Sequence, residues 1–464
     1  MKKIIIFIYF AFMVTIVYSQ KECNCKQTTN LLIKTIEKAY PGFSEKTSDK
    51  VLYNKFKHNI SLKAENSDNT HCIRIIKEYL AFFRDKHISI KMIENKEKNI
   101  SKDKTIRIEN LKKITTSKNK IVGIWKILKS NNHIGVIKSD KNSYIGFVIK
   151  NNDSINKKDY PIIFELFSDN TAMLYGNKII KTNYRIYKNS ILTFNFNTIP
   201  LILIKTEPLP NLTNDEIIKK IKELSEFYIE QLSKETTLIR LPSFGYNIVD
   251  RINKLIKNNK ILLESSKNLI IDIRGNRGGT DMAYKKLLPY VVTGSIRVNG
   301  VEYLATQNLI DELQKFLNEN IDIDKKDREN FEREIKLYKN SLGHFVNTDK
   351  TEIEIIEIEP ANKSPEQIVI IIDENVASSA ENFVFKARQS KKVKIIGTPT
   401  GGVMDYGSVR PYRFECEKYQ LFLPTFRSLR LPDYPIDNIG LQPDIYLDKS
   451  VKNWIEFSKK YLEN

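Results

Sequence analysis

The chain of 464 residues contains few of the residues that staple small proteins or bind metals: 4 cysteines, 5 histidines and 2 tryptophans. Four cysteines cannot hold so long a chain together, so its fold must rest on hydrophobic cores. Cys23-x-Cys25 is a poor zinc motif, because the ligands of zinc fingers are usually separated by about two to four residues. We therefore expect no metal and no other cofactor.

Long hydrophobic runs are also absent, with one exception at the start of the chain. Two lysines precede an almost wholly apolar stretch from Ile4 to Val17, and Ser19 supplies a small residue at the cleavage position. This pattern is typical of a secretory signal peptide. No later segment has the roughly 18–20 apolar residues that a membrane-spanning helix needs. We predict that residues 1–19 are a signal peptide and that the protein is exported, either periplasmic or secreted.

An oxidising compartment would permit disulfides. Cys72 can pair with Cys23 or with Cys25, and either bond would attach the mature N-terminus to a helix. Cys416 lies in an alternating, strand-like run, and we do not expect it to act as a nucleophile.

Basic residues exceed acidic ones by 75 to 56, which gives a formal net charge of +19. Such a balance can attract nucleic acid. The lysines are scattered, however, and no dense arginine patch or basic stripe with interleaved aromatic residues is present. We expect no nucleic-acid partner.

Hydrophobic periodicity divides the mature chain into three regions. Residues 20–112 show apolar residues at helical spacing and predict an N-terminal helical domain. From 119 to 206 the spacing changes to short alternating strands, typical of a small antiparallel β-barrel or sandwich. Residues 211–464 alternate strands with helices, which implies parallel crossover units. An insertion at about 303–363 is rich in charge and is either a lid or a surface decoration.

The elements expected in the third region can be placed by their spacing. The predicted strands are 237–241, 268–273, 368–373 and 393–397; the predicted helices are 217–232, 247–263, 283–291 and 381–389, with a further helical stretch from Leu309 to Lys339 in the insertion. Residues 95–118, rich in Lys, Asn and Thr, are predicted to be a linker.

The segment with the most chemical content follows the apolar run at 368–372. Residues 373–381 read Asp-Glu-Asn-Val-Ala-Ser-Ser-Ala-Glu, and an amphipathic stretch comes next. A strand that turns into a helix here leaves the Ser378 hydroxyl at the helix N-terminus, where unpaired N–H groups and the helix dipole favour an oxyanion. Such a turn presents a nucleophile. The spacing Ser378-x-x-Glu381 also fits a helix capping box, and this motif alone does not decide between the two interpretations.

A glycine-rich turn follows a second apolar strand. Residues 268–279 read Asn-Leu-Ile-Ile-Asp-Ile-Arg-Gly-Asn-Arg-Gly-Gly. Glycines suit a turn in which the backbone adopts positive φ or approaches a ligand closely. The turn lacks the Gly-Lys-Ser/Thr ending and the GxGxxG spacing of phosphate loops. It is either a plain strand–helix corner or a loop that directs an N–H at a substrate carbonyl.

Together, the two segments resemble the tail-specific, or C-terminal processing, serine peptidases, a family that includes the tricorn core peptidase. The resemblance covers roughly 235–450 and rests on five ordered motifs. They are Leu-Ile-Arg-Leu-Pro-Ser-Phe (238–244), Asp-x-Arg-x-Asn-x-Gly-Gly (272–279), Ser-Ser-Ala-Glu (378–381), Gly-Thr-Pro-Thr-Gly-Gly (397–402) and Gly-Leu-Gln-Pro-Asp-Ile (440–445). The resemblance implies a crotonase/ClpP-like α/β core, Ser378 as the nucleophile, and the N–H groups of Gly279 and Ser379 as the oxyanion hole.

The sequence departs from the better-known branch of this family at Val403. Those enzymes use a serine–lysine dyad, and Val403 stands where they have the lysine. Nearby lysines flank a strand and are expected to be solvated: Lys391, Lys392 and Lys394. A serine hydroxyl has almost no nucleophilicity at neutral pH without an adjacent base, so the base must come from elsewhere or the protein is inactive.

Histidine is the usual alternative base. His87 lies in Glu-Tyr-Leu-Ala-Phe-Phe-Arg-Asp-Lys-His-Ile-Ser-Ile (78–90), where helical spacing changes to strand spacing. This segment resembles the Asp-Gly-His-Thr segment of the tricorn-like branch, whose histidine is the catalytic base. His133 and His344 are weaker candidates, and His344 is expected to be structural.

A triad also needs a group that holds the imidazole. In the tricorn-like branch this is an acid shortly before the terminal Gly-x-x-Pro-Asp motif, and the resemblance implies Asp437 for this role. Asp433 and Glu415 remain as substitutes, whereas Asp444 is expected to shape the terminal turn.

The sequence thus predicts a multidomain α+β protein: an exported serine endopeptidase that hydrolyses peptide bonds through Ser378, His87 and Asp437 and an acyl-enzyme intermediate. Its partner would be a protein or peptide substrate. Processing peptidases usually carry a PDZ domain between the helical region and the core, and no loop typical of one is present. The β module therefore either positions the substrate or acts as a spacer.

Two other functions remain open. The missing lysine favours a catalytically inactive, peptide-binding homologue of the same fold. A lipid or small-ligand binder built around the β module would retain a hydrophobic ligand in residues 115–210 alone.

Overall fold

The computed structural model of the protein describes residues 23–68, 71–93, 105–107, 114, 116–117, 119–140, 143–149, 159–176, 180–194, 200–361, 365–412 and 419–464. The predicted signal peptide, Glu415, Cys416 and most of the predicted linker lie outside these residues. The described residues form two compact units. Unit 1 consists of those within 1–94, 304–344 and 408–425, and unit 2 consists of the others.

Unit 1 is mainly helical. Its helices are α1 (Cys25–Ala39), α2 (Phe43–Lys46), α3 (Lys50–Glu65), α4 (Cys72–Ala81), α10 (Gln307–Glu319) and α11 (Lys325–Asn340). A capping box starts α1, because the Gln27 N–H donates to the Asn24 side chain (2.9 Å) and the Asn24 N–H donates to Gln27 Oε1 (3.1 Å). A disulfide between Cys25 and Cys72 joins the first residues of α1 and α4, which is one of the two pairings that the sequence left open.

A small sheet ties the N-terminal part of unit 1 to residues far along the chain. β1 (Ser89–Met92) pairs antiparallel with β22 (Tyr419–Leu423), which pairs with β21 (Arg410–Tyr412). The N-terminal helices therefore share one compact unit with α10, α11 and this sheet.

The β module of unit 2 is a closed antiparallel barrel. Its eight strands are β3 (Gly123–Ile127), β4 (His133–Asp140), β5 (Ser143–Ile149), β6 (Asp159–Phe167), β7 (Thr171–Leu174), β8 (Ile180–Tyr187), β9 (Ile191–Phe194) and β10 (Leu201–Glu207). Pairing of β3 with β10 and of β6 with β7 closes the ring, and β2 (Thr105–Arg107) adds to β6 from outside. Trp125, Phe164 and Phe194 are fully or almost fully buried within one apolar cluster.

The other part of unit 2 is an α/β core around a six-stranded sheet. The strand order is β11 (Tyr228–Gln231), β12 (Thr236–Arg240), β13 (Asn268–Asp272), β18 (Gln367–Ile372), β19 (Val393–Gly397) and β24 (Ile445–Tyr446). All neighbours are parallel except β11, which is antiparallel to β12 at the edge. The four strands predicted in this region correspond to β12, β13, β18 and β19, and the parallel pairing is as expected.

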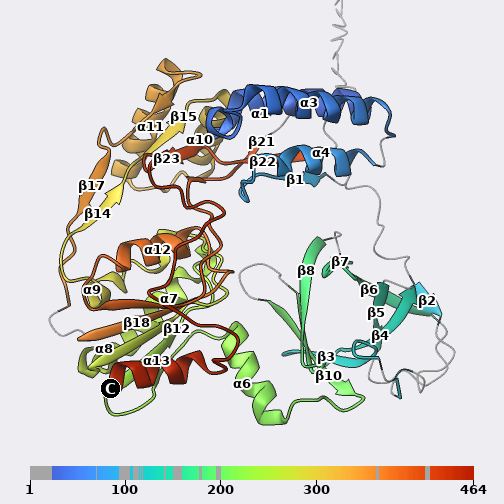
Figure 1. The fold of residues 1–464 in the computed structure, drawn as a ribbon, viewed down its shortest axis with the longest axis vertical. Coiled ribbons are helices and arrows are strands. Elements are labelled where there is room, and N and C mark those ends of the chain that lie inside the picture. Colours follow the sequence, from blue (N-terminus) through green and yellow to red (C-terminus); the bar gives the residue numbers. More distant parts are fainter. Residues whose placement is uncertain are drawn as a thin grey trace, which may run out of the picture. The chain divides into compact units, whose positions relative to one another are not determined.

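Apolar side chains cover both faces of this sheet, as parallel strands require. Ile239, Ile271 and Ile370 are aligned across three strands and face one cluster with residues of α7 (Val249–Asn258), α9 (Leu288–Val291) and α12 (Ser379–Ala387). The alternate residues face a second cluster that contains Leu462 of α13 (Trp454–Glu463). Helices α12 and α13 thus lie on opposite sides of the sheet (Figure 1).

Three predicted helices differ from the observed elements. The helix expected at 217–232 ends early, because α6 (Asn214–Ser225) stops at Glu226 and the next apolar residues form the edge strand β11. The helix expected at 283–291 is only a 3-10 turn (Asp281–Ala283) and the short α9, where Pro289 fits the first turn and donates no N–H. The segment 247–263 divides at Asn259 into α7 and α8 (Lys260–Ser265).

The insertion is shared between the two units. Its helical stretch forms α10 and α11, which belong to unit 1. The surrounding strands make two small sheets: β14 (Ile296–Asn299) with β17 (Ile353–Ile356), and β16 (Phe345–Val346), β15 (Val301–Leu304), β23 (Phe426–Ser428) and β20 (Tyr406–Gly407) in this order. No helix within the described residues is long and apolar enough to cross a bilayer.

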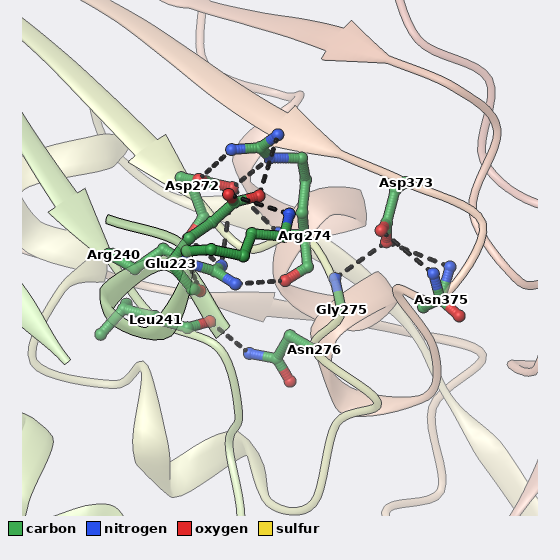
Figure 2. Close-up of polar contacts among 10 residues, drawn as sticks. Glu223, Arg240, Leu241, Asp272, Arg274, Gly275, Asn276, Asp373 and Asn375 are labelled. Carbon is green, nitrogen blue, oxygen red and sulfur yellow. Dashed lines mark hydrogen bonds and ion pairs between the residues drawn. The ribbon is translucent and has the colours of Figure 1, made fainter. Parts of the chain in front are cut away.

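Buried ion pairs fix the carboxyl ends of β12 and β13 (Figure 2). Arg274 donates to both Asp272 oxygens, from Nε to Oδ1 (2.9 Å) and from NH2 to Oδ2 (2.7 Å). Arg240 donates to the carbonyls of Asp272 (2.9 Å) and Arg274 (2.7 Å) and thereby links β12 to the turn after β13. Burial alone would raise the pKa of Asp272, but the two arginines outweigh it and lower the pKa to about 2.

This depressed pKa predicts a specific loss of stability in acid. Because the carboxyl group has a pKa near 3.9 when unfolded, its contribution of about 2 kcal/mol is present above pH 4 and is lost as pH falls towards 2. Denaturant unfolding at pH 5, 4, 3 and 2 measures the free energy of unfolding and its loss in acid. Asp272→Asn should start less stable, because it removes the anion shared by the buried Arg240 and the partly buried Arg274, and it should lose less stability across this window. Equal pH slopes for the two proteins would contradict the prediction.

Candidate active site

Ser378 stands at the N-terminus of α12 with an unusual backbone conformation. Its φ and ψ are 57° and −125°, whereas an ordinary N-cap residue has extended, β-region angles. Positive φ is strained for a residue with a side chain, and such strain concentrates at functional sites. Ser378 and Glu381 do form the capping box that the spacing fits, and the positive φ is a feature that an ordinary cap lacks.

A buried glutamate holds this strained turn in place. The Ser378 N–H donates to Glu381 Oε2 (3.0 Å), and so does the Val403 N–H (2.9 Å). The other oxygen, Oε1, accepts from the Thr400 hydroxyl (2.5 Å) and the Gly402 N–H (2.8 Å). Burial raises the pKa of Glu381, and the four donors oppose this by stabilising the carboxylate. The sequence showed Glu381 only as a possible cap, and missed its contacts with 400–403.

The two adjacent serines have different environments. Ser378 is half-buried, whereas Ser379 is 8% exposed and its hydroxyl oxygen is buried without a hydrogen-bond partner among the described residues. Ser378 is thus the more accessible of the two serines, and its role as the nucleophile stays a prediction.

The glycine-rich turn packs directly against Ser378. A Cβ added to Gly278, which has φ +83°, would lie 2.6 Å from the Ala377 carbonyl oxygen and 2.8 Å from the Ser379 nitrogen. Gly279 is exposed, and neither its N–H nor that of Ser379 finds a backbone acceptor within the described part of the chain. Two available amides therefore lie on two segments in contact, as an oxyanion hole requires.

The motifs at 397–402 and 440–445 meet behind Glu381. Thr400 is bonded to the Gly440 segment through its backbone and its side chain: its N–H donates to the Leu441 carbonyl (3.1 Å), and its hydroxyl accepts from the Leu441 N–H (2.7 Å). Gly440 has φ +76°, and an added Cβ would lie 2.2 Å from the Thr400 carbonyl oxygen. The close approach explains a glycine at this position.

Asp437 is anchored to the same loop. Its Oδ1 accepts from the N–H groups of Met404 (2.7 Å) and Asp405 (2.9 Å), and the residue is 8% exposed. A hydrogen-bonded path therefore runs from Ser378 through Glu381 and 402–404 to Asp437, and all of it lies in unit 2.

A second buried ion pair supports Asp437. Arg430 lies 3.2 Å from Asp405 Oδ1, and its NH2 donates to the Met404 carbonyl (2.9 Å). The carboxylate of Asp405 in turn accepts from the N–H groups of Ile436 (3.0 Å) and Asp437 (2.9 Å). Sequence reasoning missed Asp405 and Arg430, which carry no motif of their own.

The alternative acids are placed differently. Asp433 is exposed. Asp444 accepts from the Ile395 N–H (2.8 Å) and so fixes β24 beside β19, consistent with the expected structural role.

None of the described lysines nearest to Ser378 in the sequence takes the place of the one missing at position 403. Val403 is 8% exposed. Lys386 is buried in α12, but its Nζ donates to Asp281 Oδ2 (2.9 Å) and Tyr284 (3.1 Å), and it lies about 12 Å along the helix axis from Ser378. Lys391 and Lys394 are exposed, and Lys392 is half-buried.

His87 belongs to unit 1, where it comes just before β1. Its side chain is 14% exposed, and its Nδ1 lies 3.6 Å from Oδ1 of the buried Asp85, which also accepts from the His87 N–H (2.8 Å). Asp85 accepts from the Tyr40 hydroxyl as well (3.0 Å). The other candidates have other surroundings: His344 is exposed, and its carbonyl accepts from Ala305, while His133 is in barrel strand β4.

Comparison with known proteins places this arrangement in a family. Residues 235–447 match the family model described as peptidase family S41, a range that contains Ser378, Glu381 and Asp437. Over these residues the chain belongs to peptidase family S41. It is a serine-type peptidase. No curated protein matches it in sequence.

Several solved structures are similar to the chain over most of its length. A mutant of CPAF is 14% identical over 95% of this chain and 96% of that one, with a TM-score of 0.50. A putative peptidase from Parabacteroides merdae is 12% identical over 96% and 98%, with a TM-score of 0.46. For tricorn protease the identity is 13%, the coverage 95% of this chain and 37% of that one, and the TM-score 0.42.

The close contact at Gly278 gives a paired prediction. Gly278→Ala should reduce kcat/KM at least about tenfold, because the new methyl group collides with the backbone beside Ser378. Gly275→Ala has a similar positive φ of 78°, but nothing lies within 4 Å of its added Cβ. Both variants place an alanine at positive φ, which costs about 1 kcal/mol. Peptidase assays at equal folded concentration therefore measure the effect of the collision between the Gly278→Ala methyl group and the backbone. Equal losses in the two variants would exclude it as the cause.

The four hydrogen bonds of Glu381 predict a strong effect of an isosteric change. In Glu381→Gln, an amide NH2 group replaces one carboxylate oxygen. It faces N–H or O–H donors and can accept no hydrogen bond from them. We expect a loss of about 2–4 kcal/mol in stability and of at least about a hundredfold in kcat/KM, measured by unfolding and peptide hydrolysis. Glu366→Gln, at the exposed start of the same strand–turn–helix segment, is the matched control. Wild-type activity in folded Glu381→Gln would disprove the role.

Proposed function

We propose that the protein is an exported endopeptidase that cleaves polypeptides by acyl transfer, with Ser378 as the nucleophile. The observation that supports this best is the strained Ser378 backbone beside the available amides of Gly279 and Ser379. A capping serine needs neither the positive φ nor the adjacent glycines. The comparisons support the wider class of serine peptidases, and the roles of single residues are part of the proposal.

The reaction would proceed in two balanced steps. Ser378 Oγ attacks the scissile carbonyl carbon while His87 takes its proton, and the Gly279 and Ser379 N–H groups stabilise the oxyanion. The imidazolium returns the proton to the departing amine as the C–N bond breaks. Water, deprotonated by His87, then attacks the acyl-enzyme and releases the second product and the Ser378 hydroxyl. Asp437 would orient His87 and stabilise its cation.

His87 is chosen as the base because the core lacks the lysine of related enzymes and because His87 lies beside the buried Asp85. Valine at position 403 cannot act as a base. Lys386 lies about two helical turns along α12 from Ser378, and its Nζ donates to Asp281. His87 sits on a short, anchored segment next to Asp85. Because His87 and Ser378 belong to different compact units, the proposal requires the two units to dock in the active enzyme. We further propose the crotonase/ClpP-like arrangement for the core.

Export is supported by the chemistry of unit 1. Disulfides persist in oxidising compartments and are rare in reducing ones, and Cys25 is bonded to Cys72. The predicted signal peptide points to the same compartment. A protein found in the cytoplasm with free thiols would oppose this part of the proposal.

An inactive peptide-binding homologue is the second candidate, and the observation that favours it is Val403. A fluorophosphonate probe separates the two candidates. We expect wild type to be labelled on Ser378, Ser378→Ala not to be labelled, and His87→Ala to be labelled at least about a hundredfold more slowly, because an unassisted serine is a poor nucleophile.

Ser379→Ala and His344→Ala are the matched controls, and both should label at close to the wild-type rate. Peptide mapping by mass spectrometry locates the adduct. Folded wild type that takes up no label would favour the binding protein, and an unchanged rate in His87→Ala would assign the base elsewhere.

A further inference from the structure

A pocket of about 730 Å³ in unit 2 begins at the glycine-rich turn. Gly275, Arg277 and Gly278 form part of its wall, directly before the Gly279 amide. Strand β8 of the barrel and Trp454 of α13 contribute further side chains. The pocket is therefore adjacent to the predicted oxyanion hole, and none of the roles assigned above uses it.

Cationic side chains dominate the charged lining. Five of them reach it from β8, α6, β12 and the turn after β13: Arg185, Lys220, Arg240, Arg274 and Arg277. Most are already paired with anions. Arg240 and Arg274 share Asp272, and Lys220 Nζ donates to Glu223 (3.0 Å).

Two guanidinium groups have no carboxylate partner within the described part of the chain. Arg277 is exposed and makes no hydrogen bond or ion pair there. Arg185 donates only to the neutral amide oxygen of Asn375 (2.8 Å). These groups retain planar N–H forks that match a carboxylate.

Three acidic residues also line the pocket, two fewer than the cationic ones: Glu223, which pairs with Lys220, and Asp373 and Glu374. Asp373 accepts from the Gly275 N–H (2.9 Å) and from the backbone (3.1 Å) and side chain (3.1 Å) of Asn375 (Figure 2). Glu374 is exposed; its Oε2 accepts from the Thr398 hydroxyl (3.5 Å) and its Oε1 accepts from the Asn375 side chain (3.3 Å).

We infer that this pocket binds a carboxylate of the substrate polypeptide, with Arg277 as its main contact and Arg185 as a second one. The inference rests on the proposed function and gives it a substrate preference. Consecutive Cα atoms are about 3.8 Å apart, so Arg277 stands within about 8 Å of Gly279 along the chain. The carboxylate would thus lie within roughly three residues of the scissile bond, on an acidic side chain or at the C-terminus of a short product-like end.

The test uses the full-length protein and internally quenched peptides built on one bond that wild type cleaves. Peptides with Asp or Glu near this bond are compared with their Asn or Gln counterparts, all with amidated C-termini. A second set has neutral side chains and a free C-terminal carboxylate. We expect kcat/KM to be about tenfold higher for peptides with the carboxylate, mainly through a lower KM.

Arg277→Gln should abolish this preference, and Arg277→Lys should restore part of it, because lysine keeps the charge but not the fork. Arg333→Gln, on the exposed face of α11 and outside the pocket, is the charge-matched control and should retain the preference. If acidic peptides of the amidated set are cleaved faster, the bound carboxylate is that of an acidic side chain. If only peptides of the second set are cleaved faster, the bound carboxylate is that of the C-terminus. Equal rates for charged and neutral peptides, or an undiminished preference in Arg277→Gln, would overturn the inference.

A binding measurement keeps this inference separate from the proposed function. Fluorescence anisotropy follows a labelled alanine-rich peptide with central aspartates, against its asparagine counterpart, on the Ser378→Ala protein. Tighter binding of the aspartate peptide that is lost in Ser378→Ala/Arg277→Gln supports the subsite even if no peptide is hydrolysed. Hydrolysis without any such difference would leave the peptidase intact and remove the subsite.

Discussion

The site depends on one buried carboxylate. Glu381 accepts four hydrogen bonds: from Ser378, whose backbone is strained, and from Thr400, Gly402 and Val403. This carboxylate helps to hold the positive φ at Ser378, together with backbone hydrogen bonds from Ala377 to Asn276 (3.1 Å) and from Asn382 to Ser378 (2.9 Å). The same carboxylate fixes the 400–403 loop, to which the Asp437 segment is attached. A residue that resembles a helix cap in the sequence is therefore the junction of three separate motifs.

A second constraint is the close packing of backbone on backbone. Gly278 touches the turn before α12, and Gly440 touches Thr400, at distances that exclude a Cβ. The buried Arg240–Asp272–Arg274 group holds the first of these segments at the ends of β12 and β13. Unit 2 thus supplies a presented serine, two available amides and an anchored acid, whereas the proposed base comes from unit 1. Catalysis in this proposal is consequently coupled to the docking of the units.

The sequence predicted the features that repeat or that carry short motifs. Alternating apolar residues identified the barrel strands, and uniform apolar runs identified the four central strands of the core. The Ser-Ser-Ala-Glu and Gly-Gly segments identified Ser378 and its neighbouring amides. The prediction of a helix over 217–232 was too long, because Tyr228 and Ile229 fit a helical period but lie in the edge strand β11. The supports of Asp437, namely Asp405 and Arg430, were invisible because a buried ion pair between distant residues leaves no local pattern. Val403 showed only that a lysine was missing, and the role of His87 stays a prediction.

The most direct measurement is an experimental structure of the protein after reaction with a fluorophosphonate. The account predicts a phosphonyl group on Ser378 Oγ, with its oxygen within about 3 Å of the Gly279 and Ser379 nitrogens. The imidazole of His87 should lie within hydrogen-bond reach of Ser378 Oγ, with its other nitrogen facing Asp437. An adduct whose oxygen points away from both amides, or a His87 ring remote from Ser378 in the reacted protein, would contradict the account.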